Sequence, residues 1–212
     1  MFQVYHLLHL SNANLHLITD MTVLRNGFIL LVLSIMSFAF LQKLINAAAL
    51  TNGDNDLQIF DTRNGYAYDA VINTLTNWTF KGRCLYLLIE IIDITVYFYA
   101  YKSVFIVLIN IMVASVVDAY QFAHIKHVIR NYVYFPVILG HIDLLEDSLQ
   151  ILMTILFDFH DSEYYHTLVA ASSLANIVKW NTVRLGSAVF LILVNLYFYA
   201  YCFIKSKKDK DK

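Results

Sequence analysis

Residues 132–157 read YVYFPVILGHIDLLEDSLQILMTILF, an apolar run that carries three acidic side chains. A membrane-spanning helix needs about 20 mainly apolar residues, so this run is long enough to cross a bilayer. At about 100° per residue, Asp143, Glu146, Asp147 and Gln150 fall on one stripe of the helix. Ionisable groups at membrane depth are costly and almost always face a protein interior or a wet cavity. The run therefore predicts a helix with an inward-facing polar seam.

A second pair of acids lies in another apolar run, over residues 84–113. Glu90 and Asp93 are about one helical turn apart, so their carboxylates share a helix face. We expect the acids of the two runs to face each other and to be compensated by nearby cations, protons or a metal ion. The candidate binding cluster consists of Glu90, Asp93, Asp143, Glu146 and Asp147, with Arg83 and Lys179 as partners.

The composition is that of a membrane protein. The chain has 212 residues, of which 59% are hydrophobic and 15% charged, and its mean hydropathy is +0.58. Soluble domains are roughly half apolar and a quarter charged. The net charge of −1 provides no basic field that would attract nucleic acid. Cys84 and Cys202 are too few for a disulfide framework or a cysteine zinc site.

Four apolar blocks of spanning length predict an all-α, polytopic membrane protein with four transmembrane helices in a bundle. We expect the two far-side connections to be partly helical, because apolar residues recur there at helical spacing over residues 68–80 and 164–180. The second of these stretches either lies along the membrane interface or extends the fourth span. The predicted parts are an N-terminal segment (residues 1–26), a membrane domain (27–204, with spans at about 27–49, 84–113, 132–157 and 186–204) and a basic tail (205–212).

The first block also resembles a signal peptide. Arg25 precedes it, and three alanines at residues 47–49 imitate a small-residue cleavage site. However, the block is longer than an ordinary signal sequence, and Lys43 lies between it and the alanines. These features favour an uncleaved span.

Basic residues near the ends of the spans set the expected orientation, because cytoplasmic loops carry an excess of lysine and arginine. Arg25, Lys126, Arg130 and the lysines of residues 205–212 lie on one side. The sequence therefore predicts that both termini are cytosolic and that the two longer connections are outside or in a lumen.

Two short motifs concern the compartment. Asn77-Trp-Thr79 is an acceptor for N-glycosylation on the predicted far side. Lys208 and Lys210 resemble a cytosolic di-lysine signal for retrieval to the endoplasmic reticulum, although a simple positive-inside anchor explains them equally. Together they favour the endoplasmic reticulum or another endomembrane.

A set of scattered residues resembles an uncharacterised family of small four-span integral membrane proteins, found in bacteria and eukaryotes. The matching positions are Phe60-Asp61, Gly65-Tyr66, Gly82-Arg83, Tyr86, Asp93, Pro136, Asp143-x-x-Glu146 and Lys179-Trp180. The likeness covers roughly residues 59–205. The chain departs from the family at Val96-Tyr97, at Asp147 and at Asn176, where the family has a proline, an asparagine and usually a threonine. The resemblance implies a four-helix membrane fold and no known activity.

Three functions remain open. The first is a non-enzymatic protein that binds or passes a small cation, a proton or a lipid head group at the carboxylates. The second is a membrane-embedded hydrolase or lipid-modifying enzyme that uses paired carboxylates, although no Gly-x-Ser-x-Gly, phosphate-loop or His-Glu-x-x-His motif indicates an enzyme. The third is a structural subunit of a membrane complex. The expected partners are lipids and other membrane proteins or a second copy of the chain, and no cofactor or particular metal is indicated, although divalent cations prefer carboxylate oxygens.

Overall fold

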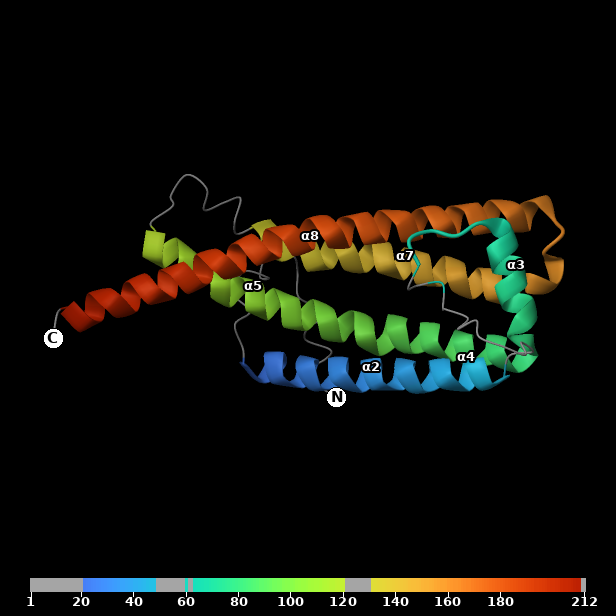
Figure 1. Cartoon of the computed structure of the whole chain (residues 1–212), viewed down its shortest axis with the longest axis horizontal. Helices are drawn as coiled ribbons and strands as arrows, with labels where there is room; N and C mark the ends of the chain where they lie inside the picture. Colours follow the sequence, from blue (N-terminus) through green and yellow to red (C-terminus); the bar gives the residue numbers. More distant parts are fainter. Residues whose placement is uncertain (1–20, 49–59, 61–62, 121–130, 211–212) are drawn as a thin grey trace. The chain divides into compact units, whose positions relative to one another are not determined.

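The computed structural model describes residues 21–48, 60, 63–120 and 131–210. Every regular element within these ranges is a helix, which confirms the all-α prediction. The elements are α2 (Met21–Ala48), α3 (Tyr68–Asn77), α4 (Thr79–Ile92), the π-helical segment η3 (Asp93–Tyr97), α5 (Phe98–Tyr120), η4 (Tyr132–Tyr134), α7 (Phe135–Ile155), η5 (Phe157–Phe159) and α8 (Glu163–Lys210) (Figure 1).

Three stretches are long and apolar enough to cross a membrane: Met21–Ala47, Thr79–Val116 and Glu163–Tyr199. Helix α7 matches the predicted span 132–157 and has 21 residues, but its three acids set it apart from these stretches. Three of the four predicted spans thus have a counterpart of membrane-spanning length and composition, and the four-span bundle stays a prediction.

Several element boundaries differ from those predicted. The expected far-side helix over residues 164–180 and the span 186–204 form one 48-residue helix, α8, that continues to Lys210 in the expected tail. The stretch contains no proline, and Gly186 alone does not end the helix. The predicted N-terminal segment lies almost entirely outside the described residues, as do Asp61, Lys126 and Arg130.

The chain divides into two compact units, to which the long helices contribute in turn. Of the described residues, the first unit contains 21–28, 101–120, 131–138 and 183–210, and the second contains 29–48, 60, 63–100 and 139–182. All the acids of the candidate cluster belong to the second unit.

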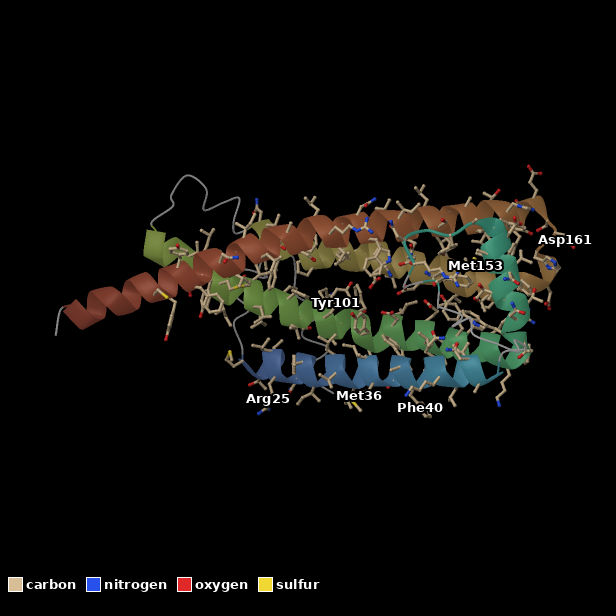
Figure 2. The ribbon with its side chains drawn as sticks, viewed as in Figure 1. Arg25, Met36, Phe40, Tyr101, Met153 and Asp161 are labelled. Atoms are coloured by element: carbon tan, nitrogen blue, oxygen red, sulfur yellow. The ribbon has the colours of Figure 1, made fainter. Side chains whose placement is uncertain are left out.

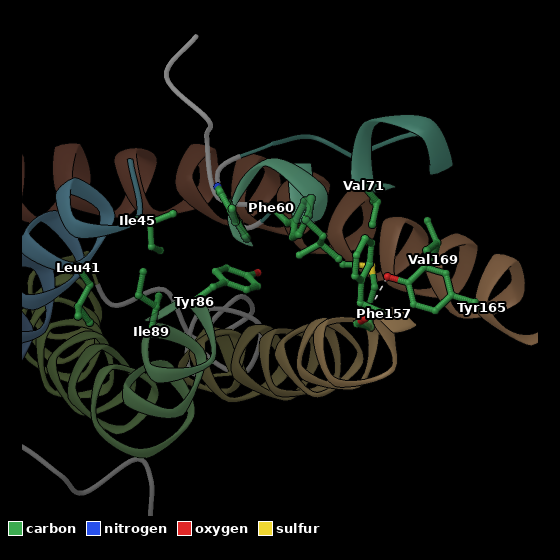
Figure 3. Packing of buried hydrophobic residues seen from close by; sticks show 12 residues of the cluster. Leu41, Ile45, Phe60, Val71, Tyr86, Ile89, Phe157, Tyr165 and Val169 are labelled. Carbon is green, nitrogen blue, oxygen red and sulfur yellow. Dashed lines mark hydrogen bonds between the residues drawn. The ribbon is translucent and has the colours of Figure 1, made fainter. Parts of the chain in front are cut away.

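The core of the second unit is built around aromatic rings. Phe60, Trp78 and Tyr86 are fully buried, and their ring centroids lie 4.8–5.6 Å apart. Toward η5, the hydroxyl of Tyr165 donates a hydrogen bond of 3.0 Å to the backbone carbonyl of Met153 (Figure 3). Helix α3 lies across this end of the unit (Figure 1). The core therefore joins α3, α4, α7 and the first part of α8.

The first unit contains a separate core of buried aliphatic side chains, with Ile109, Val113 and Val133 among its members. At its edge the hydroxyl of Tyr132 donates to the backbone carbonyl of Gly186 at 2.5 Å. A Cβ atom at Gly186 would lie 1.6 Å from the ring of Phe135, so only glycine fits there without movement of that ring.

We expect Gly186→Ala to lower the melting temperature of the detergent-solubilised protein by several degrees. Overpacking costs typically about 1–3 kcal/mol and outweighs the gain of roughly 1 kcal/mol that alanine brings to a helix. Thermal unfolding measures the difference, with Ser187→Ala at the exposed neighbouring position as the control. Equal melting temperatures for the two variants would contradict the tight approach of Phe135.

Helices α2 and α8 expose much of their apolar surface. In the most apolar windows of these helices only 17% and 11% of the residues are buried, against 61% for the stretch from Thr79 to Val116. Met36 and Phe40 project outward from α2 (Figure 2). Large exposed apolar surfaces mark contacts with membranes or with other proteins, so these faces suit a lipid environment.

Candidate functional site

The first pair of acids lies where a regular helix changes its winding. Helix α4 ends at Ile92 and is followed directly by η3, whose first residue is Asp93. The backbone N–H of Phe98 donates to the carbonyl of Asp93, which is the five-residue spacing of a π turn. Single π turns inside helices are rare and occur frequently at functional sites. Glu90 and Asp93 are both buried.

The second group of acids lies on one face of α7. Asp143, Glu146 and Asp147 are buried there, whereas Leu145 and Leu152 on other faces are exposed. This distribution follows from the helical period, which brings residues three and four apart to the same side. The buried face is the stripe that the sequence marks out.

Lys179 of α8 compensates part of this charge. Its ammonium group forms an ion pair with Asp143 Oδ1 at 3.1 Å and a second, closer pair with Glu146 Oε2. The other oxygen of Glu146, Oε1, accepts hydrogen bonds of 2.5 Å from Asn176 Nδ2 and from Gln150 Nε2. We call Glu146, Gln150, Asn176 and Lys179 the paired network.

Three further hydrogen bonds extend the paired network. The hydroxyl of Tyr86 on α4 donates to Gln150 Oε1. Asn176 Oδ1 accepts a hydrogen bond of 2.6 Å from the backbone N–H of Gly65, and its Nδ2 also reaches the carbonyl of Phe60 at 3.4 Å. Asn176 thus joins the connection that precedes α3 to the carboxylate of Glu146.

The conformation of this connection depends on Gly65. Its φ of +80° lies in the left-handed region that favours glycine. A Cβ atom there would also lie 2.8 Å from the side chain of Ile177. Close approach of the backbone to α8 therefore requires glycine at this position.

Tyr66 fixes the same connection to α8. Its backbone N–H donates to Ser173 Oγ at 2.9 Å, and its hydroxyl shares a hydrogen bond of 2.5 Å with Ser172 Oγ. Burial raises the pKa of the Tyr66 hydroxyl, so the phenol stays protonated at neutral pH. Burial also lowers the pKa of the neighbouring Arg63 guanidinium, which still stays charged.

Three aspartates form a different arrangement beside the paired network. One carboxylate oxygen from each of Asp93, Asp143 and Asp147 lies within 4.8 Å of the others, and all three residues are buried. Neither oxygen of Asp147, nor Oδ1 of Asp93, has a hydrogen-bond partner among the residues that the structure describes. We call these three residues the aspartate cluster.

The electrostatics of the aspartate cluster demand a counter-charge. At an effective dielectric constant of about 20, two unit charges 4.8 Å apart repel by about 3 kcal/mol. Removing an unpaired carboxylate from water costs several kcal/mol more. Lys179 compensates Asp143, but no salt bridge in the described ranges reaches Asp93 or Asp147, so these two carboxylates would destabilise the fold if they were ionised without a bound cation.

All seven charged residues selected from the sequence belong to the second unit, where six of them converge and Arg83 lies apart from the others. Its guanidinium is 3.9 Å from Asp158 and lies over the ring of Phe157, 4.6 Å from the centroid. Arg83 precedes Glu90 by two helical turns, roughly 10 Å of rise, so its side chain reaches η5 instead of the carboxylates. Asp158 is exposed, and an exposed pair of this kind contributes little to stability.

The sequence also contains residues whose part in the site is visible only in the structure. The spacing of Ser172, Asn176 and Lys179 in the sequence predicts that they share a helix face. The contacts of Asn176 with Gly65 and Phe60 could not be predicted, because these partners are distant in the chain. Asn77, the glycosylation candidate, is the last residue of α3, where its side chain bonds to Asn73. Its modification is untested.

Comparisons of the chain with protein-family models, with curated proteins and with solved structures give no match. The resemblance to a four-span family therefore stays a proposal. The geometry and charge of the described residues are the basis for assigning a function.

Proposed function

We propose that this protein is an integral membrane protein that binds or passes a small cation at its intramembrane carboxylates, with a proton or a cationic lipid head group as competing occupants. The observation that carries the proposal is the burial of Asp147, which is 1% exposed and whose carboxylate oxygens have no hydrogen-bond partner in the described part of the chain. A buried carboxylate without a donor is costly. A positively charged ligand removes that cost.

The proposed membrane topology has four spans, of which α7 is the third along the chain. Its buried face carries the acids, and its outer face exposes Leu145, Leu152 and Ile155. A helix with this division can cross a bilayer when its polar face packs against the other spans. On the distribution of lysine and arginine we place both termini in the cytosol. The di-lysine tail and the sequon at Asn77 favour the endoplasmic reticulum or another endomembrane.

The paired network supports a structural role for part of the site. Glu146 Oε1 accepts hydrogen bonds from Asn176 and Gln150, and Oε2 is held by the ion pair with Lys179 alone. Buried polar networks of this kind rigidify a core. We infer that the paired network holds α7 and α8 together and that the aspartate cluster beside it does the binding. A hydrolytic or lipid-modifying activity of the same carboxylates is the alternative, and a purely structural subunit is the third.

We expect Asp147→Asn to keep or raise the stability of the purified protein while abolishing its response to cations. The substitution is nearly isosteric and removes a buried charge that has no donor, and binding sites commonly carry such a stability cost. The measurement is the melting temperature in lipid nanodiscs over a series of pH values and of sodium, potassium and calcium concentrations, with choline as the inert cation.

Asp161→Asn is the matched control, because Asp161 is exposed at the turn before α8 (Figure 2). The control should respond to cations as the unaltered protein does. If Asp147→Asn melts several degrees lower than the unaltered protein and no cation or pH change affects either of them, the carboxylates are structural and the proposal fails.

A further inference from the structure

We propose that the aspartate cluster is a binding site for one hard divalent cation of about the size of Ca²⁺ or Mn²⁺, held by the carboxylates of Asp93, Asp143 and Asp147. The inference rests on the proposed function and narrows it from small cations in general to one class. The ligands come from two elements, η3 and α7, that are distant in the chain and meet inside the second unit.

The proximity of the oxygens is compatible with one shared ion. Calcium binds oxygen at about 2.3–2.6 Å in flexible geometry, so two of its ligand oxygens are at most about 4.6–5.2 Å apart. The three carboxylate oxygens lie within 4.8 Å of one another, so each pair falls within this range and small side-chain rotations suffice to bring all three to one ion. Magnesium demands nearly ideal octahedral geometry and usually keeps several waters, so it suits a dry cluster of carboxylates less well.

The unsatisfied oxygens point to the same place. Asp147 is 1% exposed and Asp93 is 5% exposed, yet three of their four carboxylate oxygens have no donor among the described residues. Buried polar groups in native proteins are almost always hydrogen-bonded, and the exceptions call for a bound ion, a bound water or a functional reason. A metal ion shared by these oxygens would satisfy all of them together.

The distribution of charge favours a divalent over a monovalent ion. The single positive charge of Lys179 is shared by Asp143 and Glu146, and no salt bridge in the described part of the chain reaches Glu90, Asp93 or Asp147. If all five acids were ionised, they would exceed this one cation by four charges. A divalent ion removes twice as many of these charges as a monovalent ion, and protons take up the remainder.

The backbone conformation at Asp93 is a further argument for a binding site. The π turn of η3 begins at this residue and adds one residue to the helical turn. The insertion changes the direction of the following side chains at the point where Asp93 has to face α7. Regular α-helical winding needs no such insertion, and π turns are commonly found at functional sites.

The test uses the full chain in lipid nanodiscs and two probes, radioactive ⁴⁵Ca²⁺ in equilibrium binding and Mn²⁺ in electron paramagnetic resonance. We expect saturable binding of one ion per chain, with each probe displaced by the other and much less by Mg²⁺ or K⁺. At about a hundredfold excess of Ca²⁺ over its Kd, the melting temperature should rise by roughly 5–10 °C relative to protein in chelator.

Asp147→Asn and Asp93→Asn should each reduce binding of both probes at least tenfold, whereas Asp158→Asn and Asp161→Asn, at exposed acids outside the cluster, should bind as the unaltered protein does. Because direct binding is measured first on the unaltered protein, a variant that fails to fold does not decide the result.

Absence of saturable binding of either probe to the unaltered protein would overturn the divalent site, as would binding that survives both substitutions. If sodium, potassium or protons then still shift the melting temperature in a manner that depends on Asp147, the broader proposal stands and the divalent class alone is wrong. If no cation has an effect, both fail.

Discussion

Replacing Lys179 with methionine is expected to lower the free energy of unfolding by about 3–5 kcal/mol, the usual cost of breaking a buried ion pair by removing one partner. Lys179 is 5% exposed, and its ammonium group bridges Asp143 and Glu146. Methionine keeps most of the side-chain volume but leaves both carboxylates without a counter-ion. In a chain of this length, each kcal/mol of lost stability lowers the melting temperature by roughly 2–4 °C, so the melting temperature should fall by about 10 °C or more.

A double-mutant cycle separates the loss of the ion pair from other effects of the substitution. Adding Glu146→Gln or Asp143→Asn to Lys179→Met removes one of the stranded charges and should recover part of the loss. Lys81→Met, at an exposed lysine on α4, is the matched control and should change the melting temperature little. Strict additivity of the Lys179 and Glu146 substitutions would contradict the ion pair.

The second large effect is expected from Asn176→Asp, which changes the shape of the side chain very little. The amide nitrogen of Asn176 donates to Glu146 Oε1 at 2.5 Å and to the carbonyl of Phe60, and the residue is fully buried. The substitution removes both donors and places a second carboxyl group against Glu146. We expect a loss on the order of 3 kcal/mol or more, because like charges in contact strongly disfavour the folded state.

Asn64→Asp, one residue before Gly65 in the same connection, makes the same chemical change at an exposed position. It should leave the melting temperature nearly unchanged. The substitution keeps an oxygen that can accept from the Gly65 N–H, but it removes the donor to the Phe60 carbonyl and repels the side chain from Glu146. This displacement should loosen the connection, so hydrogen exchange of the Gly65 and Tyr66 amides should accelerate in the Asn176 variant and stay slow in the control. Unchanged exchange would show that the connection does not depend on Asn176.

The periodicity of the sequence was sufficient to predict the helices and the buried face of α7. Positions 143, 146 and 147 share one face of a helix, and these acids avoid hydrocarbon only if that face turns toward the protein interior. This conclusion depends on neighbouring positions in the sequence alone. The convergence of Glu90 and Asp93 with this face also follows, because two costly groups in separate spans are best buried together.

The division of the acids into the paired network and the aspartate cluster could not be predicted. It depends on Asn176, whose partner Gly65 is 111 residues away in the chain. Arg83 was expected among the acids because it is a nearby cation, but rise along α4 and the contact with Phe157 direct it to η5. The sequence left open whether residues 164–180 lie along the interface or extend the fourth span, because polar residues between the two apolar parts interrupt the hydropathy pattern without interrupting the helix.

The π turn at Asp93–Tyr97 has a mechanical consequence. An extra residue in a helix can migrate by exchanging one backbone hydrogen bond for another, and each residue that it passes rotates by about 100° about the helix axis. If the insertion moved toward α4, Asp93 would swing away from α7 while the helix axes stayed in place. Release of a bound ion would then require only that a single helical turn rewinds, and whole helices would not have to move about a hinge.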